Sequence, residues 1–217
     1  MELASRPLSR FAERLAAVRA TIAEAGRDPS EVAIVAVTKT RTLRDCETAL
    51  AAGIEVLAEN RVAEGLERIA QLPAARWHLI GHLQSNKVRL AAGSFDLIQS
   101  VDSVRLAELI AQRAPRQSVL LQVNVSGEAA KHGCAPLDAI EACRKIAGLL
   151  PLEGLMGMAP LDGPPEPPFA LLARLRSEAQ NATGLGLPIL SMGMSGDYPA
   201  ALRAGSTMLR LGRALFG

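Results

Sequence analysis

Short, strongly apolar runs alternate along the chain with longer segments in which apolar residues recur every three or four positions. The short runs are rich in Val, Ile and Leu and end in polar or glycine-containing stretches, which predicts buried strands. We expect eight strands, at residues 32–37, 54–60, 76–81, 95–101, 118–125, 152–159, 187–194 and 207–212.

The segments with three-four spacing predict helices. The first helix ends at Gly26, and its apolar stripe consists of Leu8, Phe11, Leu15, Val18 and Ile22. Further helices are expected near 43–52, 61–71, 85–91, 103–113, 136–148, 168–182 and 198–204. We interpret the proline-rich stretch 159–168 as a surface loop after the sixth strand rather than as a domain boundary.

Strands that are apolar on every residue must be covered on both faces, and strands that alternate with helices are parallel and joined by right-handed crossovers. We therefore predict an α/β fold, a single-domain (β/α)8 TIM barrel over residues 1–217 with an extra N-terminal helix. The alternative is an open doubly wound sheet. Such a sheet would need a glycine-rich turn after its first strand, and the segment VAVTKTRT contains no glycine.

Composition and charge narrow the classes of partner. The formal net charge is +2 on balanced basic and acidic totals, so no basic stripe for a nucleic-acid backbone is expected. Cys46, Cys134 and Cys143 lack the spacing of a zinc site or a disulfide framework, which favours a reducing compartment. No signal-peptide or membrane-spanning segment is apparent. We expect a cytoplasmic monomer without nucleic-acid or membrane partners.

Lys39 is the first candidate for chemistry, because functional side chains of such barrels lie at the carboxyl ends of the strands. It follows the apolar run 32–37 and has no acidic residue within five positions. Partial desolvation there would favour the neutral amine, which can attack an aldehyde to form a Schiff base. The alternative is a lysine that merely ends a strand and reaches solvent, and position alone favours this alternative.

The loops after the last two strands read SMGMSGD and RLGR. This corner of a barrel commonly binds phosphate. Backbone N–H groups near an anion are expected from Gly193, Ser195, Gly196, Gly212 and Arg213. The alternative is that these glycines only permit tight turns.

Arg210 lies two residues before Gly212 and therefore faces the same side of its strand. An inward arginine needs an acceptor, either a bound ligand or a carboxylate such as Glu59. His78 and His82 flank the end of the third strand. Because neither has a second histidine or cysteine at metal spacing, we interpret them as core or loop histidines and expect no metal.

Eight segments in this order carry a resemblance: AVTKT, AENRVAEG, WHLIGHLQSNKVR, IQSVDS, QVNVSGEAAKHG, GLMGMAP, LSMGMSGDYPAAL and GSTMLRLGRALFG. The chain resembles the pyridoxal-phosphate homeostasis protein family from about residue 8 to residue 217. That family is similar to the N-terminal barrel of fold-type III alanine racemases. The resemblance implies that the cofactor is pyridoxal 5′-phosphate.

The resemblance assigns roles residue by residue. The cofactor lysine corresponds to Lys39, and the asparagine after the second strand to Asn60. The phosphate-binding serine corresponds to Ser195 and the glycine after the last strand to Gly212. The arginine that faces the pyridine nitrogen corresponds to Arg210.

Lys131 aligns with a lysine of the family's Lys-x-Gly element and is a secondary candidate for the aldehyde. The chain departs from the family at two positions. Ala58 replaces a glycine before Glu-Asn, and Arg213 replaces a threonine or serine after the last-strand glycine. The phosphate there would lose a hydroxyl contact, which the guanidinium can replace with a charge-assisted bond.

The resemblance implies a role in intracellular cofactor homeostasis, with reversible Schiff-base storage and delivery to pyridoxal-phosphate-dependent apo-enzymes. The alternative is a pyridoxal-phosphate-dependent amino-acid racemase. Racemisation needs two bases, and the second in racemases is a tyrosine from another domain, whereas the single tyrosine here is Tyr198. An arginine at the ring also leaves the cofactor a poor electron sink. A Schiff-base aldolase is disfavoured, because it leaves the phosphate corner without a ligand.

Overall fold

The computed structural model describes residues 2–128 and 131–217. The strands are β1 Ala33–Val37, β2 Val56–Glu59, β3 Arg76–Leu79, β4 Leu97–Val101, β5 Ser118–Gln122, β6 Leu152–Met156, β7 Ile189–Ser191 and β8 Met208–Leu211. The helices are α1 Glu2–Glu24, α2 Leu43–Ala51, α3 Val62–Gln71, α4 Val88–Ala91, α5 Val104–Arg113, α6 Ala139–Ala147, α7 Glu166–Thr183, α8 Tyr198–Arg203 and α9 Arg213–Phe216. Three short 3₁₀ turns are η1 Pro29–Glu31, η2 Ser85–Lys87 and η3 Pro136–Asp138.

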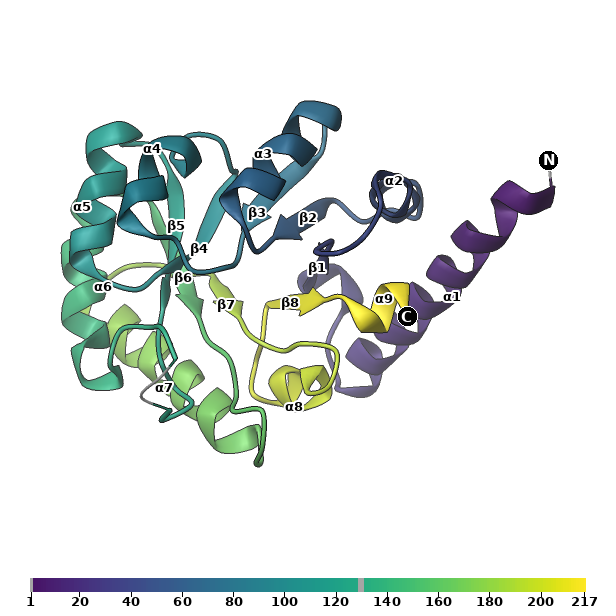
Figure 1. Cartoon of the computed structure of the whole chain (residues 1–217). Helices are drawn as coiled ribbons and strands as arrows, with labels where there is room; N and C mark the ends of the chain where they lie inside the picture. Colours follow the sequence, from purple (N-terminus) through teal and green to yellow (C-terminus); the bar gives the residue numbers. More distant parts are fainter. Residues whose placement is uncertain (1, 129–130) are drawn as a thin grey trace.

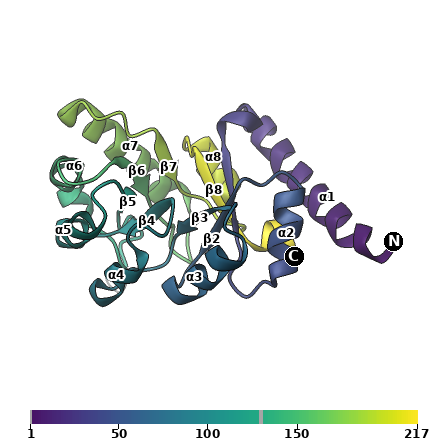
Figure 2. The same cartoon turned by 90° about the horizontal axis from the view of Figure 1, so that it is seen from above.

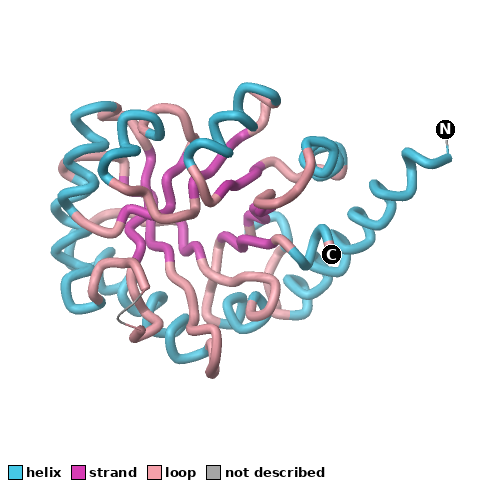
Figure 3. The backbone as a smooth tube through the Cα atoms, in the orientation of Figure 1, coloured by secondary structure: helices cyan, strands magenta, loops and turns pink. Residues whose placement is uncertain are grey.

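The strands form a closed barrel in sequence order, and β8 pairs with β1 in parallel. The closing register places Val35 opposite Arg210 and Ala36 opposite Leu211. Helices surround the strands, as the cyan and magenta segments of Figure 3 show, and Figure 1 gives the order of the elements. The predicted barrel is thus confirmed, and the open sheet is excluded because β1 and β8 are hydrogen-bonded neighbours.

The N-terminal helix packs on the barrel by only part of its predicted apolar stripe. Phe11, Leu15, Val18 and Ile22 are each at most 3% exposed, whereas Leu8 is 38% exposed. Figures 1 and 2 both show the first turns of α1 extending away from the barrel. Leu8, the first residue of the predicted stripe, is therefore exposed, because the helix extends beyond the part of the barrel that it covers.

Element ends differ most from prediction at the carboxyl side of the strands. The strands predicted at 118–125, 152–159 and 187–194 end at Gln122, Met156 and Ser191. Most of the residues that follow are apolar, but they belong to the loops that form the barrel mouth rather than to the strands. The segment predicted as a helix at 85–91 is η2 followed by a single turn, α4. Helix α9 was not predicted.

Two apolar cores stabilise the barrel. The larger core lies between strands and helices. The smaller one fills the barrel with residues Val35, Val56, Ala58, Leu97, Leu120, Met156 and Met208. Layers of inward side chains make such a barrel a packed core rather than a pore. Within the described part of the chain, no helix is long and apolar enough to cross a membrane.

Candidate functional site at the barrel mouth

Lys39 lies immediately after β1, on a segment held by its neighbour. The Thr38 hydroxyl donates to the Ala58 carbonyl at 3.1 Å and to Glu59 Oε1 at 2.6 Å. Thr40 has φ 63°, a left-handed conformation that a β-branched residue rarely adopts. Lys39 itself is exposed, so the expected partial desolvation was wrong. The backbone around this amine is fixed while the side chain is free to meet a ligand.

Glu59 and Asn60 provide acceptors beside Lys39. Glu59 is 2% exposed, and this burial raises the pKa of its carboxyl, an effect that the Thr38 hydroxyl opposes. Glu59 Oε2 and Asn60 Oδ1 are buried without a hydrogen-bond partner among the described residues. Lys39 and Asn60 both line a cavity of ≈ 630 Å³ between the β1–α2 loop and α3. Unpaired buried acceptors at a mouth are typical of a site that completes its bonding with a ligand.

The loops after β7 and β8 meet as the sequence predicts. Ser195 Oγ accepts from the Ala214 amide at 3.0 Å, and the Gly193 carbonyl accepts from the Arg210 amide at 3.0 Å. Gly193 has φ 96°, and a Cβ there would lie 2.7 Å from the Ala201 methyl group. Gly193 is therefore required by a tight turn, which agrees with the alternative that the glycines of this corner only permit tight turns. Gly196 has open space around it and no such constraint.

Gly212 and Arg213 form the β8 side of this corner. Gly212 precedes α9, and a Cβ there would be in ordinary contact with the Val37 backbone, two residues before Lys39. Arg213 is the first residue of α9 and is exposed. Its guanidinium has no hydrogen bond or ion pair with any residue that the structure describes, so it is available to an anion at the surface of the corner.

Arg210 points into the barrel, as predicted, and is 4% exposed. Its guanidinium donates to Ser191 Oγ at 2.7 Å and to the Gly157 carbonyl at 3.0 Å. No carboxylate within residues 2–128 and 131–217 forms an ion pair with it, so the alternative pairing with Glu59 is contradicted. Burial lowers the pKa of Arg210 to about 10, which leaves it charged near neutral pH.

A buried polar chain extends from Arg210 across the barrel. Ser191 Oγ donates to Gln99 Oε1 at 2.6 Å, and Gln99 Nε2 is 2.9 Å from His78 Nδ1. His78 is 2% exposed, and burial lowers its pKa to about 4. His78 is thus a core histidine, as predicted. The sequence placed these residues in strands but gave no signal that they join into one chain.

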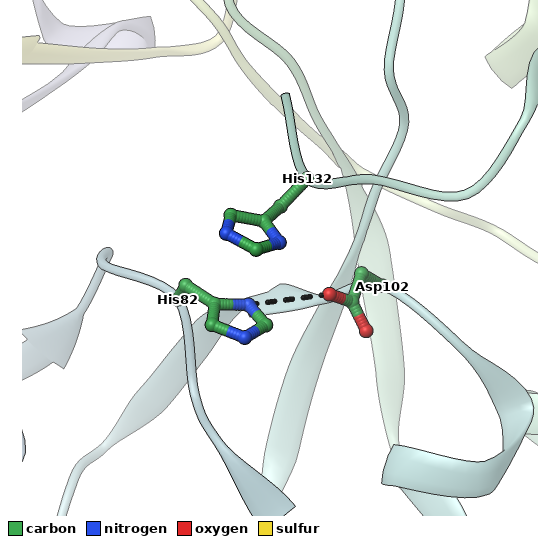
Figure 4. Close-up of side chains that lie close together, drawn as sticks. All are labelled: His82, Asp102 and His132. Atoms are coloured by element: carbon green, nitrogen blue, oxygen red, sulfur yellow. Dashed lines mark ion pairs between the residues drawn. The ribbon is translucent and has the colours of Figure 1, made fainter. Parts of the chain in front are cut away.

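Three further polar side chains gather at the ends of β3, β4 and β5, and sequence reasoning missed this cluster. His82 Nδ1 lies 3.3 Å from Asp102 Oδ2, and the rings of His82 and His132 stack with centroids 3.7 Å apart (Figure 4). Asp102 directly follows β4, whereas His82 and His132 lie in the loops after β3 and β5, so the sequence spacing gave no signal for the cluster. Nearby, Lys131 pairs with Glu128 at 2.7 Å; residues 129 and 130 of this loop lie outside the described residues.

The mouth therefore has two sides. We call the ends of β7, β8, β1 and β2 the first arc, with residues Lys39, Asn60, Ser195, Arg210, Gly212 and Arg213. We call the ends of β3, β4 and β5 the second arc, with residues His82, Asp102 and His132. A cavity of ≈ 780 Å³ lies at the opposite end, lined by strand starts such as Ala33 and Arg76. Barrels of this type rarely use that end for function.

The closed eight-stranded parallel barrel with a lysine after its first strand defines a class, the alanine-racemase-like barrels. The family model "Alanine racemase, N-terminal domain" matches residues 8–217. Curated relatives are named pyridoxal phosphate homeostasis protein. The one from Pseudomonas aeruginosa is 42% identical over 97% of this chain and 96% of its own, and the one from Deinococcus radiodurans is 42% identical over 93% and 97%. The chain belongs to this family.

Solved structures agree with the fold. PipY of Synechococcus elongatus, solved with pyridoxal phosphate bound, is 37% identical, with a TM-score of 0.83 over 95% of this chain and 100% of its own. Alanine racemase from Corynebacterium glutamicum is 15% identical, with a TM-score of 0.77 over 97% of this chain and 60% of its own. The racemase likeness shows the shared barrel alone.

Proposed function

We propose that this protein binds pyridoxal 5′-phosphate in the first arc and holds it reversibly as a cofactor-homeostasis protein. The observation that carries the proposal is the juxtaposition of three groups on neighbouring strands. Lys39 offers an exposed amine, and Ser195 and the start of α9 meet in one corner. Arg210 is buried and has no carboxylate partner among the residues that the structure describes. The family relatives, including PipY with its bound cofactor, support the same assignment.

The residues present fit the cofactor. When bound, pyridoxal phosphate would supply an aldehyde that condenses reversibly with a primary amine, with loss of water. Lys39 would provide that amine at the edge of the ≈ 630 Å³ cavity. Asn60 lines the same cavity, and its buried Oδ1 has no hydrogen-bond partner among the described residues. Ser195, Gly212 and the exposed guanidinium of Arg213 would hold the phosphate, and the positive charge of Arg210 would face the ring.

We further propose that the protein performs no strong turnover. Its single tyrosine, Tyr198, donates its hydroxyl to Thr21 of α1 at 3.3 Å and so is engaged away from the mouth. A charged Arg210 cannot accept a proton from a ring nitrogen, which disfavours carbanion chemistry. In this proposal the protein is a cytoplasmic monomer, and its physiological partners are apo-enzymes that need the cofactor.

The test is reduction of the cofactor-loaded protein with borohydride, followed by peptide mass spectrometry. We expect a visible absorbance band from the loaded protein and a covalent adduct on Lys39. Lys39→Ala should lose at least tenfold in adduct yield, while the matched control Lys87→Ala, another exposed lysine, should keep it. An unchanged yield in Lys39→Ala would refute the assignment of Lys39, and an adduct on Lys131 would move the site to the fifth loop.

Turnover is tested separately. The loaded protein should racemise alanine no faster than free pyridoxal phosphate at the same concentration. A rate clearly above that background would replace the homeostasis role with the racemase alternative. Transfer is tested by mixing the loaded protein with an apo-enzyme, where restored enzyme activity is expected and its absence would contradict delivery.

A further inference from the structure

The second arc contains a set of metal-ligating groups that the proposed function does not use. His82, Asp102 and His132 each offer one ligand atom, and these atoms all lie within 4.8 Å of one another. Figure 4 shows a ring nitrogen of each histidine on the side of the Asp102 carboxylate. We propose that these three residues bind a divalent transition-metal ion of the zinc type.

Hydrogen bonds anchor the backbone at the two histidines and the side chain of Asp102. The Gly81 carbonyl, next to His82, accepts from the Ser100 hydroxyl at 2.7 Å. The His132 carbonyl accepts from Gln122 Nε2 at 2.9 Å. Asp102 Oδ1 accepts from the Ser103 hydroxyl at 3.2 Å, a bond that leaves Oδ2 for the metal. Such support from neighbouring groups orients ligands and raises metal affinity.

The side chains themselves need only a small movement. Tetrahedral zinc sites have bonds of about 2.0–2.2 Å, so their ligand atoms lie roughly 3.4 Å apart. His82 Nδ1 and Asp102 Oδ2 are already 3.3 Å apart. The two rings are stacked, with 8° between their planes, so one must rotate before both nitrogens address a single ion. Both histidines are exposed, which leaves room for that rotation.

The donor set selects the ion. Two imidazoles and one carboxylate suit zinc and other first-row transition metals, whereas Mg²⁺ and Ca²⁺ prefer oxygen ligands. Three protein ligands leave a fourth position open, and the exposure of the cluster gives water or an anionic ligand access to it. The proposed metal site contains no residue of the first arc, so metal binding does not depend on the cofactor.

The test is titration of tag-free protein with Zn²⁺, followed by calorimetry. We expect one ion per chain with micromolar or tighter affinity, and no binding of Mg²⁺. His82→Ala, His132→Ala and Asp102→Asn should each weaken the binding at least tenfold, while Asp162→Asn, an exposed carboxylate outside the cluster, should not. The Lys39→Ala variant should bind zinc like the wild type, which excludes zinc held by the cofactor. Stoichiometry below half, or full affinity in the histidine variants, would overturn the proposal.

A footprint on the wild-type protein avoids any folding defect of the variants. Diethyl pyrocarbonate should modify His82 and His132, and Zn²⁺ should protect both, as read by peptide mass spectrometry. The buried His78 should stay unmodified under both conditions and serves as the internal control. Equal modification of His82 and His132 with and without zinc would overturn the proposal, whatever the outcome at Lys39.

Discussion

The two arcs of the barrel mouth are held in different ways. In the first arc, the groups around the predicted ligand form buried bonds to the scaffold, such as Arg210 to Ser191 and Thr38 to Glu59. In the second arc, anchored backbone presents exposed side chains, such as His82 and His132. This difference indicates that the first arc is preorganised for a large ligand, whereas the side chains of the second arc can move to surround a small ion.

Two features join the arcs. Gly81 packs against the Asn60 carbonyl of the first arc and immediately precedes His82 of the second. Below the mouth, the polar chain from His78 through Gln99 to Ser191 and Arg210 links the strands of both arcs. Substitutions at these joints should affect both arcs, and substitutions within one arc should leave the other intact.

The largest effect is expected from Gly81→Ala, because a Cβ at this position would lie 1.9 Å from the Asn60 carbonyl oxygen. The backbone of both arcs would have to move, which should lower the free energy of unfolding by about 4 kcal/mol or more. Urea denaturation measures this change in the free energy of unfolding. Gly186→Ala is the control, because a Cβ there meets nothing within 4 Å. Equal stability of the two variants would show that the arcs are not joined at Gly81.

The next effect is a pH dependence from His78, whose pKa is lowered to about 4 by burial. As the pH falls below about 6.5, the unfolded chain gains a proton at this histidine that the folded chain does not bind. Stability is therefore lost with acid, by about 3 kcal/mol once the pH has reached 4. Urea denaturation at several pH values should show a weaker loss in His78→Gln.

The exposed His82 provides the matched control for that experiment. His82→Gln should keep the wild-type loss of stability with acid, because this side chain belongs to the exposed second arc. If His78→Gln and wild type lost equal stability between pH 7 and pH 4, His78 would not be buried in its neutral form.

A smaller effect is expected from Ser195→Ala, which removes the acceptor of the Ala214 amide and so loosens the junction of the β7 and β8 loops. The free energy of unfolding should fall by about 1 kcal/mol. Affinity for inorganic phosphate, measured by calorimetry, should fall as well, while zinc binding stays unchanged. A loss of zinc affinity in this variant would contradict the independence of the two arcs.

The smallest effect is expected on folding stability from His82→Gln. The His82–Asp102 pair is partly exposed, and such pairs contribute about 0–1 kcal/mol. We expect the free energy of unfolding at pH 7 to change by less than about 0.5 kcal/mol, by urea denaturation. A larger loss would mean that this pair is needed for the fold and would weaken the contrast between the arcs.

The fold was predictable because the same local pattern, an apolar strand followed by an amphipathic helix, recurs along the sequence. Eight apolar runs and the helices between them indicated the barrel, and closure between β1 and β8 followed. The ends of β5, β6 and β7 were not predictable, since apolar residues such as Val125 and Met192 are buried in loops as completely as in strands. Helix α9 is too short to show a periodicity.

The sequence predicted which residues form the first arc, but it did not predict their exposure or their hydrogen-bond partners. Lys39 follows a predicted strand, and the segments SMGMSGD and RLGR lie at the carboxyl ends of two others, so barrel geometry alone brings them to one end. The exposure of Lys39, the unpaired Asn60 Oδ1 and the choice of Ser191 rather than Glu59 as the partner of Arg210 depend on side-chain packing. Their roles toward the cofactor stay predictions.

The sequence by itself determined the class of fold and the family, because periodicity and ordered motifs are properties of consecutive residues. Only the tertiary structure decided the second arc, since His82, Asp102 and His132 are separated by twenty or more residues and meet solely because β3, β4 and β5 are neighbours. The polar chain beneath the mouth has the same origin. Contacts between strands depend on register, and a single sequence does not display register.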